Sequence, residues 1–149
     1  MRTIPASELA IHSDGSVFHL HLKPEQLADR VVLVGDPARV TTVASYFDSQ
    51  ECEVSSREFH TITGQYKGKR ITVVSHGIGT DNIDIVLNEL DALANIDFST
   101  RTIFTAGIQA TFPGSYRDFR RVTAICPDRD LCGSGEIDRI RRGHLFLRK

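Results

Sequence analysis

The chain has 149 residues, of which 40% are hydrophobic and 25% are charged. This length and composition predict one ordinary globular domain with a buried core. No apolar run is long enough to span a membrane, the N-terminus lacks the apolar segment of a signal peptide, and the three cysteines form no CxxC pair. We therefore expect a cytoplasmic protein with reduced thiols and no membrane partner.

The net charge of −1 conceals a strong asymmetry along the chain. Residues 1–100 contain eight basic and 14 acidic residues, giving −6, whereas residues 101–149 contain ten and five, giving +5. A basic C-terminal part can bind nucleic acid. Because no feature other than this basic tail favours nucleic-acid binding, we expect no nucleic-acid partner.

The first part of the chain is polar and mixed, and residues 1–16 are expected to form a leader or arm. Val17–Leu22 then alternates between apolar and polar residues, which predicts a short extended segment with His19 and His21 on one face. A His-x-His pair can bind zinc, but a zinc site needs further ligands and none stands nearby in the sequence.

Four consecutive apolar residues at 31–34 predict a buried strand, and Gly35 follows it directly. The apolar spacing of Pro37–Phe47 predicts a helix, with the proline in its first turn and Asp36 as its N-cap. The backbone N–H groups at such a turn and the helix dipole attract anions, and Arg39 can bind a phosphate or carboxylate through two nitrogens. An ordinary strand-to-helix turn with a solvated arginine is the alternative.

The next residues predict three strands. Residues 51–56 form the first strand, and residues 58–66 and 70–75 form a hairpin across a Lys-Gly-Lys turn.

A second glycine turn, at Gly77-Ile78-Gly79, follows this hairpin. Residues 82–95 have a helical apolar period, and Asp81 is the predicted N-cap. Alternating strands and helices predict an α/β fold, in which both glycine turns belong near the carboxyl ends of strands. The turn lacks the third glycine of a dinucleotide fingerprint, so we do not expect NAD binding.

These segments together resemble the nucleoside phosphorylase family, and its uridine phosphorylase branch most closely. The resemblance covers about residues 15–100. It rests on the order of Val17-Phe18-His19-Leu20, Gly35-Asp36-Pro37-Ala38-Arg39-Val40, Arg57-Glu58-Phe59, Gly77-Ile78-Gly79 and the helix from Asp81 to Leu90. It implies a three-layer α/β fold with a mixed sheet, here apparently truncated on the C-terminal side.

The resemblance also implies roles for individual residues. The backbone N–H of Gly35 and the side chain of Arg39 would bind inorganic phosphate, and Arg57 would reach the phosphate of a neighbouring subunit. His19 would cross the same interface and contact the ribose 5′-hydroxyl.

The resemblance places three further features around this site. Gly77, Ile78 and Gly79 would line the pocket, and Glu58 would help to hold a monovalent cation. No side chain is identified as catalytic, and no cofactor is implied besides phosphate as co-substrate. The expected assembly is a homodimer or a larger homo-oligomer with shared active sites.

Residues 101–149 do not match the family. The segments expected to complete the phosphate site and to bind base and ribose are missing there. Nine arginines but only one lysine occur in this stretch, which is typical of a G/C-rich gene translated out of frame; a genuine diverged tail is the alternative. We therefore regard residues 1–149 as one partial phosphorylase domain and expect this chain to be a very weak phosphorylase or inactive.

The function predicted by the resemblance is phosphate-dependent cleavage of the N-glycosidic bond of a nucleoside, which gives a free base and a pentose 1-phosphate. Two alternatives remain open, namely a nucleosidase of the same fold that uses water, and a non-catalytic phosphate-binding fragment. Arg39 and Arg57 favour phosphate over water as the attacking group, since a neutral water molecule needs no cationic binding site.

Overall fold

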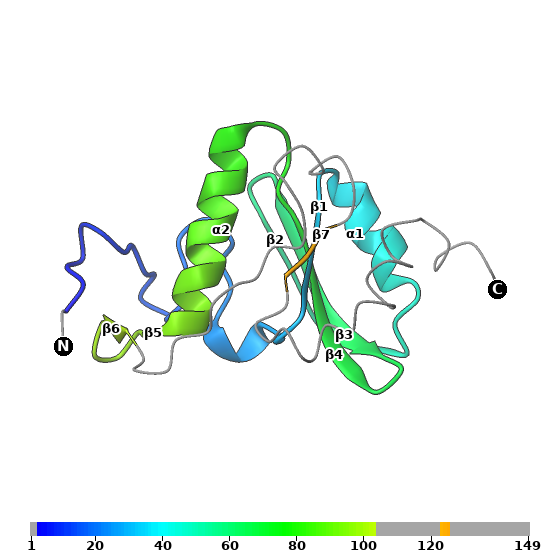
Figure 1. The fold of residues 1–149 in the computed structure, drawn as a ribbon, viewed down its shortest axis with the longest axis horizontal. Coiled ribbons are helices and arrows are strands. Elements are labelled where there is room, and N and C mark those ends of the chain that lie inside the picture. The colour runs from blue at the N-terminus through cyan, green and yellow to red at the C-terminus, as the bar shows by residue number, and fades with distance from the viewer. Residues whose placement is uncertain (1–2, 104–122, 126–149) are drawn as a thin grey trace.

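Strands and helices alternate along the chain, as the sequence predicts (Figure 1). The structure is a computed structural model that describes residues 3–103 and 123–125. In chain order the elements are η1 (Pro24–Gln26), β1 (Val31–Val34), α1 (Pro37–Ala44), β2 (Ser49–Ser56), β3 (Phe59–Tyr66), β4 (Lys69–Ser75), α2 (Thr80–Asn95), β5 (Ile96–Asp97), β6 (Thr102–Ile103) and β7 (Thr123–Ile125).

The main sheet is mixed, with the strand order β2-β3-β4-β1-β7. Neighbouring strands from β2 to β4 are antiparallel, β1 runs parallel to β4, and β7 lies antiparallel on the other side of β1. The register pairs Val34 with Ser75, so β1 and β4 end at the same edge of the sheet. Strands β5 and β6 form a separate small hairpin.

Helices α2 and α1 cover opposite faces of the sheet (Figure 1). Alternate residues of β1 point into two different cores: Val31 and Leu33 pack with residues of α2, whereas Val32 and Val34 pack with residues of α1. A strand that is buried on both faces needs apolar residues at every position, which explains the unbroken Val-Val-Leu-Val run. The predicted three-layer α/β fold is confirmed.

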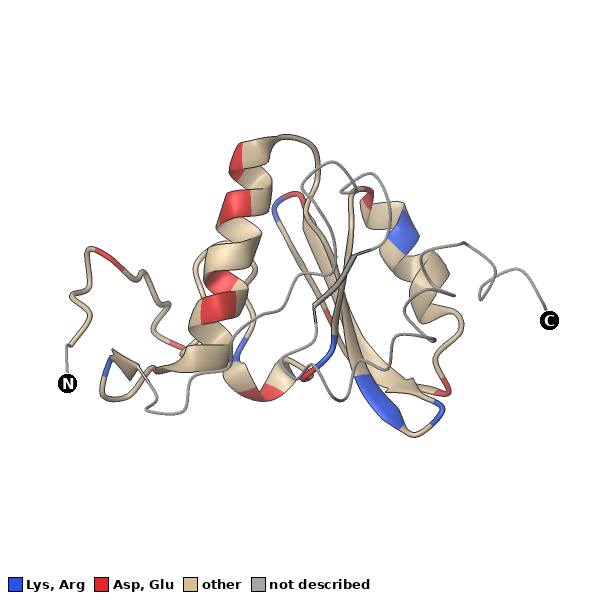
Figure 2. Cartoon of the chain, viewed as in Figure 1, with Lys and Arg blue, Asp and Glu red and all other residues tan. Residues whose placement is uncertain are grey.

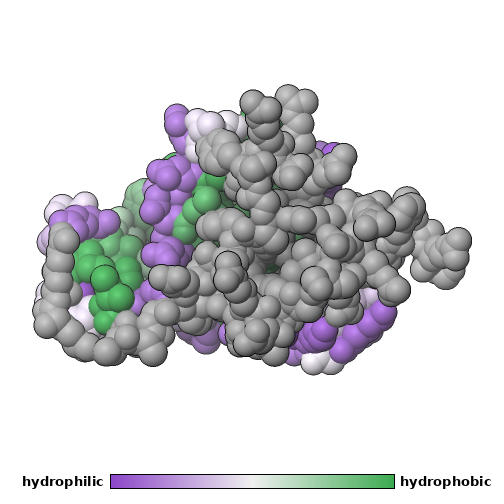
Figure 3. Space-filling model, viewed as in Figure 1, coloured by the Kyte–Doolittle hydropathy of each residue, from purple (hydrophilic) through white to green (hydrophobic). Residues whose placement is uncertain are grey.

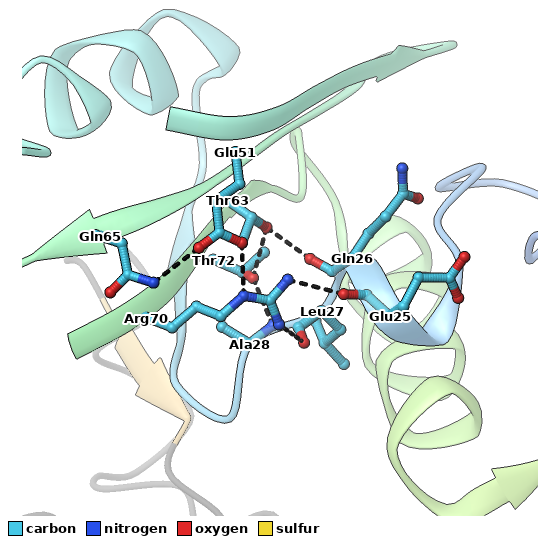
Figure 4. Close-up of polar contacts among 9 residues, drawn as sticks. All are labelled: Glu25, Gln26, Leu27, Ala28, Glu51, Thr63, Gln65, Arg70 and Thr72. Carbon is cyan, nitrogen blue, oxygen red and sulfur yellow. Dashed lines mark hydrogen bonds and ion pairs between the residues drawn. The ribbon is translucent and has the colours of Figure 1, made fainter. Parts of the chain in front are cut away.

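Arg70 joins the sheet to η1 at the edge opposite the ends of β1 and β4 (Figure 4). Its guanidinium donates to the carbonyls of Leu27 and Glu25, each at 2.8 Å, and its Nε donates to Glu51 at 2.7 Å. Beside it, the buried Thr72 hydroxyl accepts from the Ala28 N–H at 2.9 Å. These side-chain bonds satisfy backbone groups in and just after η1 that are not paired in the sheet.

The predicted extended segment at Val17–Leu22 is wrong. Residues 18–20 form a turn, and the N–H of His21 donates to the Val17 carbonyl at 3.2 Å. The N–H groups of His19 and Leu20 donate to the carboxylate of Glu89 on α2, so no strand partner takes them. The hydrogen bonds to Glu89 on α2 therefore determine the backbone conformation here, and the local alternation of apolar and polar residues does not.

Two helix boundaries also differ from the prediction. Helix α2 begins at Thr80 with Gly79 as its N-cap, so the predicted capping role of Asp81 is wrong. The φ of Gly79 is +106°, a conformation that favours glycine, and Asp81 lies in the first turn instead. Helix α1 starts as predicted, with Asp36 accepting from Ala38, but ends at Ala44, three residues early.

The two ends of the described range 3–103 lie against each other. The predicted leader makes backbone contacts through residues 3–16: the Ile4 N–H donates to the Arg101 carbonyl at 2.8 Å, and Thr3 forms an isolated bridge with Thr102. Residues 104–122 and 126–149 of the atypical tail lie outside the described residues. Within the described part, neither helix has the length and apolar character needed to cross a bilayer.

The surface in view is largely hydrophilic along α2 and around the β3–β4 hairpin (Figure 3). Helix α2 contains four acidic residues and no basic residue (Figure 2). Helix α1 carries one basic residue, Arg39.

Candidate functional site

The two glycine turns meet at the edge where β1 and β4 end. The N–H of His76 donates to the Val34 carbonyl at 2.9 Å, which extends the parallel pairing by one step beyond β4. A methyl group on Gly35 would lie 3.7 Å from Cε1 of His76 and 3.8 Å from the carbonyl oxygen of Gly77. The structure therefore brings Gly35 and Gly77 together, at the place where α/β sheets bind ligands.

Helix α1 begins at this edge of the sheet. Asp36 caps the helix by accepting from the Ala38 N–H at 2.9 Å, and the Arg39 N–H donates to the Asp36 carbonyl at 3.0 Å. Arg39 is exposed one turn into the helix, and Gly35 is half-buried in front of it. A backbone N–H at a helix start and a nearby exposed guanidinium are groups that bind phosphate.

The second turn contains a buried histidine and an exposed isoleucine. His76 is 5% exposed, and its burial holds the pKa of the imidazole below the ordinary value of 6.5. Ile78 is 95% exposed between the two glycines, and its carbonyl accepts from the Asn82 side chain at 3.3 Å. The turn thus combines an exposed apolar side chain with a buried imidazole.

The turn between β2 and β3 reaches the same edge. Thr61 pairs with Val74, so the chain that precedes Phe59 lies next to the end of β4. Glu58 in this turn has its Cγ 3.8 Å from the position that a methyl group on Gly77 would take. The carboxylate of Glu58 therefore stands beside the second glycine turn.

Arg57, next to Glu58, contacts the turn that carries His19. Its guanidinium carbon lies 5.2 Å from the centre of the Phe18 ring, and the centres of the Phe18 and His19 rings are 5.0 Å apart in an edge-to-face arrangement. Arg57 has a φ of +55°, a strained backbone conformation for this residue. The structure brings Arg57, Phe18 and His19 into one cluster, although their segments are distant in the sequence.

His19 has a fixed orientation because of Glu89. Its Nδ1 lies 2.7 Å from Oε1 of this carboxylate, and its side chain is 32% exposed. His21, by contrast, packs beside His12 with its Nε2 3.8 Å from Asp14. Across residues 3–103 and 123–125, no group of three or more His, Cys, Asp or Glu side chains could hold a metal ion.

Three residues of this region were missed by the sequence analysis, namely Phe18, His76 and Glu89. Glu89 left a signal, because it occupies the apolar stripe of its helix between Val86 and Leu93. An acidic residue on a buried helix face needs a partner, and the pattern alone does not say which one. Phe18 and His76 left no signal of comparable strength.

The comparison with protein families decides which family this fold belongs to. The sequence model of the phosphorylase superfamily matches residues 29–108, which is more than half of the chain and includes both glycine turns. The chain belongs to the phosphorylase superfamily. The predicted resemblance is confirmed, and the match continues slightly beyond residue 100.

Individual relatives in this superfamily are nucleoside phosphorylases. A uridine phosphorylase of Thermococcus kodakarensis is 38% identical over 96 residues, which cover 64% of this chain and 34% of that protein. A purine nucleoside phosphorylase (DeoD-type 2) of Vibrio cholerae is 30% identical over 132 residues, which cover 86% of this chain and 52% of that protein. Both uridine and purine nucleoside phosphorylases are therefore among the relatives.

A solved structure supports the same assignment. The nucleoside phosphorylase of Trypanosoma brucei, whose crystal structure is described as showing uridine phosphorylase activity, superposes with a TM-score of 0.62 and 42% sequence identity. The superposition covers 69% of this chain and 33% of that protein. This phosphorylase-superfamily chain thus spans about a third of the uridine phosphorylases that it matches.

Proposed function

We propose that the chain forms the phosphate-binding part of a nucleoside phosphorylase. The observation that carries this proposal is the meeting of Gly35 and Gly77 at the common end of β1 and β4, with Arg39 exposed one turn into α1. The Gly35 N–H and the Arg39 guanidinium would bind inorganic phosphate, the co-substrate. The superfamily membership and the named relatives support the same activity.

The reaction is the phosphate-dependent cleavage of a nucleoside to free base and pentose 1-phosphate. Phosphate is held under the anomeric carbon while the base departs, and its negative charge stabilises the oxocarbenium-like sugar. This chemistry requires placement of an anion and no covalent intermediate on the protein. We propose uridine as the substrate, and the cytoplasm as the place of action.

The cluster at Phe18 supplies the remaining roles. We propose that Arg57 and His19 act in the site of a neighbouring copy, where Arg57 contacts phosphate and His19 contacts the ribose 5′-hydroxyl. The active assembly is then at least a homodimer. Ile78 with its flanking glycines lines the pocket, and the Glu58 carboxylate supplies one oxygen ligand to a monovalent cation.

Thermal melting with phosphate tests the anion site. Phosphate at millimolar concentration should raise the Tm of the 149-residue chain, because a ligand that binds only the folded state stabilises it. Arg39→Ala should abolish this rise and leave the melt without phosphate nearly unchanged, since the side chain is exposed.

The matched control is Lys67→Asn, which removes a positive charge at the β3–β4 turn on the opposite edge of the sheet. The Lys67 φ of +49° is one that asparagine tolerates. This control should keep the full response to phosphate. An equal response in wild type and Arg39→Ala would contradict the site.

Release of uracil from uridine, with and without phosphate, tests the reaction. A phosphorylase requires phosphate, whereas release that does not depend on phosphate would identify a nucleosidase. We expect very low phosphate-dependent activity or none from the 149-residue chain, because the groups expected to bind base and ribose do not appear after residue 100. Turnover at a rate ordinary for an enzyme would contradict this expectation.

A further inference from the structure

Glu89 places a buried carboxylate on the face of α2 that packs against the sheet. The residue is only 9% exposed, and its neighbours on this face are the apolar Val86, Leu90 and Leu93. Burying a charge in such a position is costly unless hydrogen bonds compensate for the lost water. All the hydrogen bonds described for Glu89 come from one short turn that contains His19 and Leu20.

The two carboxylate oxygens divide these donors between them. Oε1 accepts from the His19 N–H at 2.8 Å and lies 2.7 Å from the His19 Nδ1. Oε2 accepts from the Leu20 N–H at 2.8 Å and is 3.1 Å from the His19 N–H. The carboxylate thus holds the backbone of the turn and the imidazole ring at once.

The contact between the Glu89 carboxylate and the His19 ring determines which ring nitrogen carries the hydrogen. A carboxylate can only accept, so the Nδ1 of His19 must carry hydrogen. When the imidazole is neutral, its Nε2 is then a lone-pair acceptor, and this nitrogen points away from Glu89. The side chain of His19 is 32% exposed whereas that of Glu89 is 12% exposed, so the outer part of the ring is accessible to a ligand.

The cluster around Phe18 limits the other rotations of the ring. The Phe18 ring meets the His19 imidazole edge to face, with 84° between the planes, and Arg57 covers the Phe18 ring. The ring is therefore held by an aromatic neighbour and by a carboxylate. A group that must meet a ligand in one orientation is commonly built in this way.

We propose that Glu89 is a positioning residue that holds His19 as the Nδ1–H tautomer, so that Nε2 accepts a hydrogen bond from a sugar hydroxyl. This inference deepens the proposed function and rests on it for the identity of the ligand. It assigns a direction to the contact: the hydroxyl donates and the imidazole accepts. A sugar that lacks a hydroxyl donor at the 5′ position is then discriminated against at this point.

Nitrogen-15 NMR of the histidine side chains tests the tautomer without any need for turnover. The chain has six histidines, and His19→Asn identifies the signals of His19. At a pH where the ring is neutral, we expect hydrogen on Nδ1 and a lone pair on Nε2 for His19. This is the tautomer that a histidine free in water disfavours, so the wild-type spectrum alone overturns the proposal if it shows Nε2–H.

Glu89→Gln should reverse the tautomer. An amide oxygen at the Oε2 position can accept from both the Leu20 N–H and the His19 N–H, so we expect it there, with the NH₂ group at the Oε1 position beside Nδ1. That group donates to Nδ1, which forces the hydrogen of His19 onto Nε2. A folded variant in which His19 keeps Nδ1–H would contradict the positioning role and leave Glu89 a purely structural contact.

Glu53→Gln is the matched control. Glu53 contacts the ring of His60 through Nε2 at 2.7 Å in the same way, but it lies on β2 and is largely exposed. This variant should alter the signals of His60 and leave those of His19 unchanged. A change at His19 in the control would mean that the tautomer responds to net charge, which would also contradict the assignment.

Titration with uridine and 5′-O-methyluridine in the presence of phosphate connects the tautomer to the ligand, because the methylated oxygen can accept a hydrogen bond but cannot donate one. In the wild type, uridine should shift the Nε2 signal of His19 and bind about tenfold more tightly than 5′-O-methyluridine, and Glu89→Gln should reduce this preference. If the tautomer reverses as expected while uridine leaves the Nε2 signal of His19 unchanged, the proposed ribose contact of His19 fails and the action of Glu89 on His19 stands. If uridine binds with the same preference in both proteins, the positioning role fails.

Discussion

The N–H of His76 bonds to the carbonyl of Val34 at 2.9 Å and so fixes the relative position of the two glycine turns. Residue 34 ends β1 and residue 76 follows β4, which places Gly35 and Gly77 at adjacent points of one sheet edge. The candidate site depends on this backbone hydrogen bond. Arg39 follows the turn at Gly35, and Glu58 lies against the turn at Gly77.

The stability of the chain should depend on the ionisation of His76. Burial lowers the pKa of His76 in the folded chain below its ordinary value of 6.5, so the unfolded chain binds this proton more readily. The resulting stabilisation is complete above pH 6.5 and is lost as the pH falls from there through the lowered pKa. The Tm should therefore decrease on acidification through this window.

The variant His76→Gln isolates this contribution from those of the other histidines. Its Tm should change less between pH 7.5 and pH 5 than the Tm of the wild type, which thermal melts at matched ionic strength will measure. Parallel curves for the two proteins would show that His76 contributes nothing to the pH dependence.

Gly64 should tolerate no side chain. A methyl group there would lie 2.6 Å from Cδ2 of Phe47 and in direct collision with the carbonyl oxygen of Ser49. Gly64→Ala should lower the free energy of unfolding by about 1–3 kcal/mol, since backbone cannot move aside cheaply. Urea denaturation measures this difference.

Gly35→Ala is the control for this loss of stability. Among the described residues its methyl group would meet nothing closer than 3.7 Å, and its backbone lies outside the positive-φ region. We expect its free energy of unfolding to stay within about 0.5 kcal/mol of the wild type. Equal destabilisation by the two substitutions would contradict the packing described around Gly64.

Arg70→Lys should destabilise the chain although it keeps the charge. The planar guanidinium reaches the carbonyls of Leu27 and Glu25 and the carboxylate of Glu51 at the same time, and an ammonium group cannot reproduce this geometry (Figure 4). Loss of the two carbonyl bonds should cost about 1–3 kcal/mol in urea denaturation. An unchanged midpoint would show that η1 is held in place by other contacts.

The shared site predicts that the protein associates. The purified chain should sediment as a dimer or a larger species, because His19 and Arg57 are proposed to act in the site of a neighbouring copy. In a full-length relative, mixing two inactive variants at the positions matching His19 and Arg39 should restore part of the activity. Absence of rescue after demonstrated subunit exchange would place these residues in the same subunit's site.

The sequence by itself determined the α/β class, the start of α1 at its Asp36 cap, the β3–β4 hairpin and the superfamily. The first three features follow from local rules, since an apolar run, a capping residue and a Lys-Gly-Lys turn act within a few neighbours, whereas the superfamily follows from the resemblance. The predicted roles of Gly35, Arg39 and the other site residues come from the resemblance and stay predictions.

Only the tertiary structure decided which distant residues act together. His19 and Glu89 are 70 positions apart, and their contact turned a predicted extended segment into a turn held by a carboxylate. Likewise, the parallel register of β1 and β4 decided that two glycine turns share one edge. Such contacts depend on chain topology and burial, because a buried carboxylate bonds to whichever donors the fold brings within reach, and no local pattern specifies them.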